Sequence, residues 1–166
     1  MNKIGIIMGS DSDLPIAEKE IEKLAEYGIN YEVHVYSAHR TPEETIRFAK
    51  EARQNGFDAL IGIAGKAAHL AGVIAANTTL PVIGVPVNSS LEGMDALLST
   101  VQMPPGIPVA TVGIDGAANA AILAAEILAV SDEKLAQLLL KKRIEAKEAV
   151  LEKNHRIEEK WNGGTK

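Results

Sequence analysis

Ser37-Ala38-His39-Arg40-Thr41-Pro42 is the stretch that decides how this chain folds, because it joins a strand pattern to a helix pattern. Residues 30–36, just before it, alternate apolar and polar side chains as a β-strand does. Thr41 is suited to cap a helix, and Pro42 is suited to the first helical position, where no backbone donor is needed. The stretch is therefore predicted to be a turn at the carboxyl end of a strand, where ligands bind in open parallel α/β sheets.

The same turn combines three kinds of side chain that can bind or transform a small anionic molecule. The imidazole of His39 can exchange protons near neutral pH, and the guanidinium of Arg40 offers paired donors to a phosphate or carboxylate. Ser37 adds a hydroxyl. A polar turn that only caps a helix is the alternative, and for this stretch alone it would be preferred. Two further polar turns in equivalent positions favour a binding site.

Strand and helix patterns alternate along most of the chain. Short apolar runs that end in polar turns predict strands over residues 3–8, 30–36, 59–63, 81–85 and 109–114. Apolar residues at helical spacing lie between and after them, with predicted helices that include residues 67–76, 94–101 and 119–130. This alternation predicts an α/β fold with a single doubly wound parallel sheet. The expected architecture is flavodoxin-like, with three α/β/α layers and strand order 2-1-3-4-5.

A long charged helix is predicted after the last strand–helix unit, from Asp132 to about residue 160. Its apolar positions are Leu135, Leu139, Ala146, Val150, Ile157 and Trp161. Such a helix would span roughly 40 Å, more than one small domain needs, so its narrow apolar stripe predicts packing on a neighbouring subunit. A helix folded back on its own domain is the alternative. The expected division is an α/β domain over residues 1–131 and a helical extension over 132–162, followed by a disordered end at 163–166.

The composition is that of an ordinary globular protein and excludes several kinds of site. Of the 166 residues 46% are hydrophobic, and 17 basic and 22 acidic side chains give a net charge of −5, which argues against a nucleic-acid surface. The chain has no cysteine, which excludes disulfides, thiolate catalysis and cysteine-bound metals. No apolar run approaches the ~20 residues of a membrane span. The first run is too short for a secretory signal, so a cytoplasmic protein is expected.

A second polar turn, Gly9-Ser10-Asp11-Ser12-Asp13, follows the first predicted strand. This turn is suited to bind a phosphate or a ribose. It offers backbone donors from Gly9 onward, the hydroxyls of Ser10 and Ser12, and the N-terminus of the helix that follows. Asp13 is suited to accept from sugar hydroxyls. Helix capping by Ser10 and Asp13 is an equally good interpretation of the local sequence. The spacing matches neither a Walker loop nor a G-x-G-x-x-G turn.

A third turn follows the third predicted strand, within Ala64-Gly65-Lys66-Ala67-Ala68-His69-Leu70-Ala71-Gly72. Lys66 lies where a cation opposes the helix dipole, which is acceptable at the surface and also suits an anion-binding site. His69 fits either a core or capping histidine, the commoner case, or a catalytic group. The 4 histidines include no i, i+4 pair, so no metal site is predicted. The residues alone indicate a site for a phosphorylated or anionic small molecule with one proton-transferring histidine, and they do not identify the reaction.

Several motifs resemble those of a known family. They are MGSDSDL at residues 8–14, SAHRTP at 37–42, AAHLAG at 67–72, LPVIGVPV at 80–87 and LLSTVQMPPGIPVATV at 97–112. By these motifs the chain resembles, over nearly its whole length, the PurE family of bacterial-type N5-carboxyaminoimidazole ribonucleotide mutases. The resemblance implies a doubly wound α/β catalytic domain assembled as a homo-octamer, with the C-terminal helix packed on a neighbour.

The resemblance also implies a small phosphoribosyl aminoimidazole as substrate, and it assigns roles to residues. His39 matches the general acid/base of the family. Ser10, Asp13 and Arg40 match substrate-binding positions, beside Gly9 and Ser12 of the same turn. The wall around the imidazole ring and the migrating carboxylate matches Ser37, Gly65, Lys66, Ala67, His69 and Leu70.

The implied reaction belongs to de novo purine biosynthesis. The N5-carbamate of N5-carboxyaminoimidazole ribonucleotide loses CO2, which stays trapped, and the ring is carboxylated at C4, with His39 moving the protons. The product is 4-carboxy-5-aminoimidazole ribonucleotide. The resemblance implies no cofactor, whether biotin, ATP or metal. From the charge balance and the lack of a long apolar run, neither a nucleic-acid nor a membrane partner is expected.

One residue departs from the family pattern. Many members have glycine where this chain has Lys66, and a related subgroup, the aminoimidazole ribonucleotide carboxylases that use CO2 directly, tends to carry a basic residue near this point. That subgroup does not typically show the AAHL run of residues 67–70. The mutase is therefore the main expectation and the carboxylase the first alternative. A non-catalytic nucleotide-binding protein on the same fold is the second.

Overall fold

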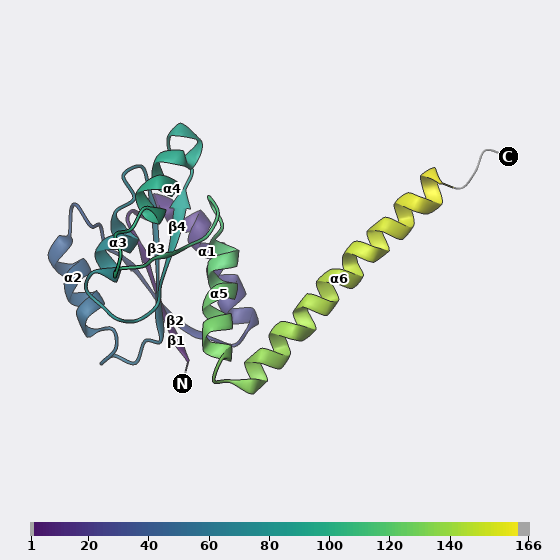
Figure 1. Ribbon diagram of the computed structural model, residues 1–166, viewed down its shortest axis with the longest axis horizontal. Coiled ribbons are helices and arrows are strands. Elements are labelled where there is room, and N and C mark those ends of the chain that lie inside the picture. Colours follow the sequence, from purple (N-terminus) through teal and green to yellow (C-terminus); the bar gives the residue numbers. More distant parts are fainter. Residues whose placement is uncertain (1, 163–166) are drawn as a thin grey trace. The chain divides into compact units, whose positions relative to one another are not determined.

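The computed structural model describes residues 2–162, which form a five-stranded parallel sheet with helices on both faces (Figure 1). The strand order β2-β1-β3-β4-β5 confirms the predicted flavodoxin-like arrangement. Residues 163–166, predicted to be disordered, lie outside the described residues. The elements are β1 (Lys3–Met8), η1 (Asp11–Asp13), α1 (Leu14–Glu26), β2 (Asn30–Val35), α2 (Pro42–Glu51), β3 (Ala59–Gly65), α3 (Leu70–Ala75), β4 (Val82–Val87), η2 (Leu91–Gly93), α4 (Met94–Val101), β5 (Ala110–Thr111), α5 (Ala117–Ala129) and α6 (Glu133–Trp161).

The burial of each strand follows its place in the sheet. β1, β3 and β4 are almost wholly buried because both of their faces are covered, whereas the side chains of the edge strand β2 are exposed or half-buried. β5 is shorter than the predicted strand over residues 109–114. Beyond β5, the N–H groups of Val112 and Asp115 donate to the carbonyls of Gly84 and Pro86. Three residue steps of this segment therefore run beside two residue steps of β4. This extra residue ends the regular ladder.

Figure 1 shows α2 and α3 on one face of the sheet and α1 and α5 on the other. α3 packs closely on β3 because Gly62 has no side chain; a Cβ there would lie 3.1 Å from the Cα of Ala71. The predicted helix over residues 67–76 is wrong at its start, since α3 begins at Leu70. Lys66 has a left-handed backbone (φ 56°), so the chain first makes a turn over residues 66–69.

The chain divides into two compact units, the first ending at Leu128 and the second beginning at Ala129. In the second unit, the carboxylate of Asp132 caps α6 by accepting from the N–H of Leu135 at 3.1 Å. Leu135 and Leu139 of the predicted apolar stripe are buried, and its members from Ala146 onward are exposed. No helix within residues 2–162 is both long and apolar enough to cross a membrane.

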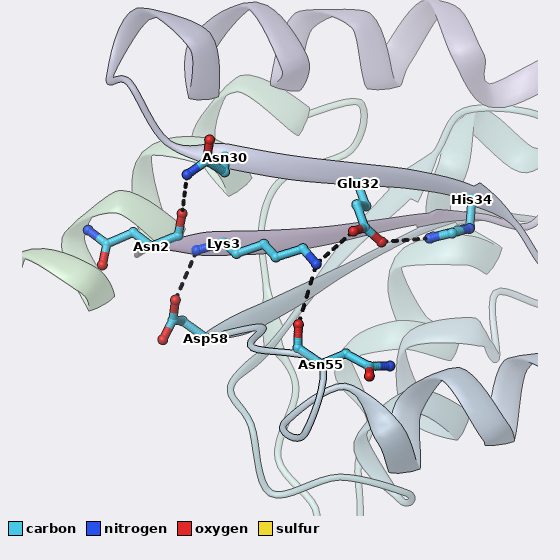
Figure 2. Close-up of polar contacts among 7 residues, drawn as sticks. All are labelled: Asn2, Lys3, Asn30, Glu32, His34, Asn55 and Asp58. Atoms are coloured by element: carbon cyan, nitrogen blue, oxygen red, sulfur yellow. Dashed lines mark hydrogen bonds and ion pairs between the residues drawn. The ribbon is translucent and has the colours of Figure 1, made fainter.

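A polar network joins the amino ends of β1 and β2 to the segment before β3 (Figure 2). The ammonium of Lys3 lies 2.6 Å from Glu32 Oε1 and donates to the carbonyl of Asn55 at 3.4 Å, and it lowers the pKa of Glu32. The backbone N–H of Lys3 donates to Asp58 Oδ2 at 2.9 Å. Glu32 Oε2 in turn lies 3.5 Å from His34 Nε2. Apart from His34, which lies one residue before the end of β2, these contacts tie the strands together near the edge opposite to the three polar turns.

Glu20, in the middle of α1, is a fully buried acidic side chain. Its relative exposure is 0%, and neither carboxyl oxygen has a hydrogen-bond partner among the described residues. Burial raises the pKa of Glu20 well above its usual range, because the ionised form would lose water without gaining a partner. The folded chain therefore holds this proton more tightly than the unfolded chain, in which glutamate titrates near pH ~4.3. Stability must fall as the pH rises from there through the folded-state pKa.

Glu20→Gln should make the free energy of unfolding less dependent on pH, because the amide has no proton to lose. The variant should be more stable than the wild type by about 1 kcal/mol or more at pH 8, and by less at pH 5. Urea unfolding at the two pH values measures both differences. Glu18→Gln, at an exposed position of the same helix, is the matched control and should change neither. An equal gain at both pH values would contradict a protonated, buried Glu20.

Candidate active site

The three polar turns meet because the strands that precede them are neighbours in register. Met8, the last residue of β1, pairs with Val35 at the end of β2 and with Ile63 near the end of β3. The N–H of Gly9 still bonds to the carbonyl of Ile63 at 2.9 Å. The chain segments that follow β1, β2 and β3 therefore emerge side by side at one edge of the sheet, as predicted for parallel strands.

Ser37 organises the turn after β2. Its hydroxyl oxygen accepts from the backbone N–H groups of His39 and Arg40 at 3.3 and 3.2 Å and from Arg40 Nε at 3.4 Å. Thr41 closes the turn from the other side, because its Oγ1 accepts from the Ser37 N–H at 2.8 Å and donates to the Ser37 carbonyl at 3.2 Å. Thr41 thus occupies the predicted cap position of α2, but its side chain makes no capping bond there.

Arg40 links this turn to the one after β1. Its Nη2 donates to the carbonyl of Gly9 at 2.8 Å, which holds the guanidinium across the ends of the two strands. The charge of Arg40 also acts on Asp13 and favours its ionised form. The remaining guanidinium donors are placed to bind an anion at this edge.

The turn after β1 is built on Ser10. Its hydroxyl accepts from the N–H and the hydroxyl of Ser12 at 3.3 and 3.0 Å, so Ser10 caps the short helix η1. Asp13 stands at the cap position of α1 without a side-chain capping bond, and it is buried. Burial raises the pKa of Asp13, while hydrogen bonds from Ser10 and Ser12 and the charge of Arg40 oppose that rise. The carboxyl is thus held in place as a buried hydrogen-bonding group.

The turn after β3 brings a second imidazole to the first. Nδ1 of His69 lies 2.8 Å from Nε2 of His39, and the two rings meet edge to face at 80°. Lys66 precedes this imidazole in its left-handed conformation. Gly65 is required here for space, because a Cβ would overlap the hydroxyl of Ser89 from the segment after β4.

These turns enclose a cavity of about 580 Å³. All the residues predicted for the site line it: Gly9, Ser10, Ser12, Asp13, Ser37, His39, Arg40, Gly65, Lys66, Ala67, His69 and Leu70. Ala38, Ala64 and Ser89 line it as well and were not predicted. A smaller hollow of about 300 Å³ adjoins it beyond Arg40 and adds Asp11, Val35 and Thr41. A cavity of this size suits a nucleotide-sized ligand.

Ser89 lines the cavity but was not among the predicted site residues, and the reason is informative. It lies in a polar loop after β4, at the same edge of the sheet as the other turns, and that position was the available signal. A loop without charge or aromatic side chains gives no chemical reason to select one serine over its neighbours. Its contact with Gly65, which joins the fourth strand end to the cavity, exists only in three dimensions.

Gly65→Ala should destabilise the fold by about 1–3 kcal/mol, because the new methyl group overlaps Ser89. Ser89→Gly in the same chain removes the obstacle and should recover most of the loss, as a double-mutant cycle by chemical denaturation would show. Gly113→Ala is the control, since nothing lies within 4 Å of its Cβ position. Additive effects of the Gly65 and Ser89 substitutions would show that the two residues do not meet.

Known proteins resemble the chain over nearly its whole length. A family model described as AIR carboxylase matches residues 3–149. The N5-carboxyaminoimidazole ribonucleotide mutase of Methanocaldococcus jannaschii is 56% identical over 156 residues, which cover 94% of this chain and 98% of that protein. The protein of the same name from Thermotoga maritima is 51% identical over 160 residues, covering 96% and 94%.

The fold has a close match as well. The crystal structure of Treponema denticola PurE superposes with a TM-score of 0.83 at 28% identity and covers 94% of this chain and 98% of that one. This agreement and the sequence matches confirm the resemblance drawn from the motifs. By its family model and its relatives, the chain belongs to the AIR carboxylase family.

Proposed function

We propose that this chain is an N5-carboxyaminoimidazole ribonucleotide mutase of purine biosynthesis. The observation that carries the proposal is the single cavity in which His39, Arg40 and the hydroxyls of two turns converge. Relatives more than half identical to this chain bear the mutase name. The proposed location is the cytoplasm, since a phosphorylated substrate does not cross membranes unaided.

The phosphoribosyl part of the substrate is assigned to the turns after β1 and β2. Arg40 offers its free guanidinium donors to the phosphate, and the backbone N–H groups from Gly9 onward add neutral donors. Ser10 and Ser12 present hydroxyls at the cavity wall, and Asp13 is placed to accept from ribose hydroxyls. The fixed hydrogen bonds within these turns reduce the ordering that substrate binding has to impose.

The aminoimidazole and its carboxylate are assigned to the other side of the cavity. There the wall is formed mainly by small or apolar residues, beside the paired imidazoles and Lys66. The residues proposed for this part are Ser37, Gly65, Lys66, Ala67, His69 and Leu70. Holding CO2 against such a wall, beside the ring carbon, is the proximity effect that the reaction needs.

His39 is proposed to move the proton in both directions. It first donates a proton to N5 as the N5–carboxylate bond breaks, which releases CO2 and leaves a neutral amine. The ring carbon C4 then forms a bond to the trapped CO2, and neutral His39 takes the proton that C4 loses. His39 gives up one proton and regains one, so one general acid/base serves the whole reaction.

The direct carboxylase would use only the second half of this sequence, starting from aminoimidazole ribonucleotide and CO2. Lys66, a cation at the cavity wall, is the observation that keeps this alternative open. The mutase names of the relatives favour the mutase. A protein that only binds nucleotides is disfavoured, because a binding site gains nothing from an imidazole held ready for proton transfer.

The decisive assay presents the purified chain with each substrate separately and follows the C-carboxylated product by its absorbance. Efficient use of N5-carboxyaminoimidazole ribonucleotide, with only weak use of aminoimidazole ribonucleotide in CO2-rich buffer, is the expected result. Efficient use of CO2 alone would assign the carboxylase instead. Binding without turnover of either substrate would leave the non-catalytic protein.

His39→Asn should lower kcat by about 10²–10⁴-fold, because the amide cannot give and take a proton. Substrate binding, measured by calorimetry, should change little. His155→Asn, at an exposed position on α6, is the matched control and should keep full activity. Turnover that survives in the His39 variant would remove this residue from the chemistry.

We also propose that the chain assembles with further copies of itself, and that the extension over residues 132–162 packs on the core or on a neighbouring copy. Support comes from large apolar side chains that α6 exposes: Leu140, Ile144, Val150, Leu151, Ile157 and Trp161. Such side chains are normally covered when they gather along one helix. An octamer is the expected size, by resemblance to the PurE family.

Sedimentation should therefore give a mass of several chains for the wild type, and eight chains is the expected number. Replacing Ile157 and Trp161 together by glutamate should lower that mass, because charge on an apolar contact opposes association. Lys153→Gln, a polar change at an exposed position of the same helix, should leave it unchanged. A monomeric wild type would contradict the proposal.

A further inference from the structure

The contact between His39 and His69 restricts where protons can lie in the cavity. At 2.8 Å, Nε2 of His39 and Nδ1 of His69 are close enough for a hydrogen bond, and the rings meet edge to face. Two N–H groups or two bare lone pairs cannot make such a contact. One proton therefore lies between the two nitrogens, and one ring is the donor.

We propose that His69 is a positioning residue that accepts this proton from His39 and so fixes the tautomer of the general acid/base. The inference rests on the proposed function, in which His39 alternates between neutral and charged forms. When His39 is charged, both of its ring nitrogens carry a proton, so Nε2 must donate. Only an acceptor at His69 Nδ1 keeps the contact through the whole cycle.

The consequence for His39 is a defined division of labour between its two nitrogens. Nε2–H stays directed at His69, and Nδ1 is the nitrogen that gives a proton to N5 and takes one from C4. Neutral His69 stabilises the charged form of His39 through a charge-assisted hydrogen bond without taking the proton itself. This is the role that an orienting partner has in other acid/base pairs.

The backbone holds both rings from separate strand ends. The N–H of His39 donates to Ser37 Oγ within the turn after β2. In the turn after β3, the N–H of His69 donates to the carbonyl of Ala67 at 2.8 Å, and its carbonyl accepts from Val73 at 2.9 Å. These bonds fix the backbone that carries each ring, and the two rings contact each other directly.

The test compares His69→Phe, which keeps a flat ring without an acceptor, with His69→Asn, which keeps an acceptor oxygen. In the phenylalanine variant kcat should fall by roughly 10–100-fold while KM changes little, because orientation of the acid/base is lost but the cavity wall remains. The asparagine variant should recover part of kcat.

Imidazole ¹⁵N NMR of the substrate-free chain gives a readout that does not depend on turnover. Neutral His39 should carry its proton on Nε2 in the wild type, and His69→Phe should shift it toward a mixture of tautomers. The spectrum of His39→Asn identifies the His39 signals, and His155→Phe, on α6, is the control for loss of one imidazole. Circular dichroism and thermal unfolding show whether each variant is folded.

The outcomes separate this inference from the proposed function. A wild type that turns over neither substrate would overturn the mutase, while the NMR result would still decide the tautomer. Normal turnover with an unchanged His39 tautomer and kcat in His69→Phe would overturn the positioning role. A higher KM with unchanged kcat would also overturn it and make His69 part of the binding wall only.

Discussion

The pairing of β1 with strands on both of its sides is the constraint on which the site depends. Met8 faces Val35 across one ladder and Ile63 across the other, so the ends of three strands are held at one level. The hydrogen bonds from Gly9 to Ile63 and from Tyr36 to Met8 extend this order one residue past the strands. A shift of either register would move a whole turn, since each turn begins at a strand end.

Several features of the site lower the stability of the folded chain. Lys66 has a left-handed backbone conformation that residues other than glycine rarely adopt, at a cost of about 1 kcal/mol. Asp13 is withdrawn from water, and Gly65 gives up a side chain so that Ser89 can approach. The surrounding sheet compensates for these costs and keeps the groups in place before a ligand arrives. Pre-organisation of this kind leaves less ordering to be done in each catalytic cycle.

The fold and the three turns could be predicted from the sequence because their signals are local. Buried strands are short apolar runs, and one rule, that parallel strands end at a common edge, places the turns together. The late start of α3 was not predicted, because no pattern in the alanine-rich run indicates that the backbone of Lys66 is left-handed. The hydroxyl of Thr41 was expected to cap a helix and instead turns back to Ser37. The contact of His39 with His69 joins residues that no spacing rule connects.

The position of the cavity along the chain has a consequence for how such a protein can change. Every residue that lines the larger cavity falls between Gly9 and Ser89, whereas the exposed apolar side chains of α6 begin at Leu140. The residues proposed for chemistry and the apolar side chains of α6 proposed for self-association therefore occupy separate stretches of sequence. Mutations that remodel one stretch need not touch the other, so the two properties can diverge at different rates.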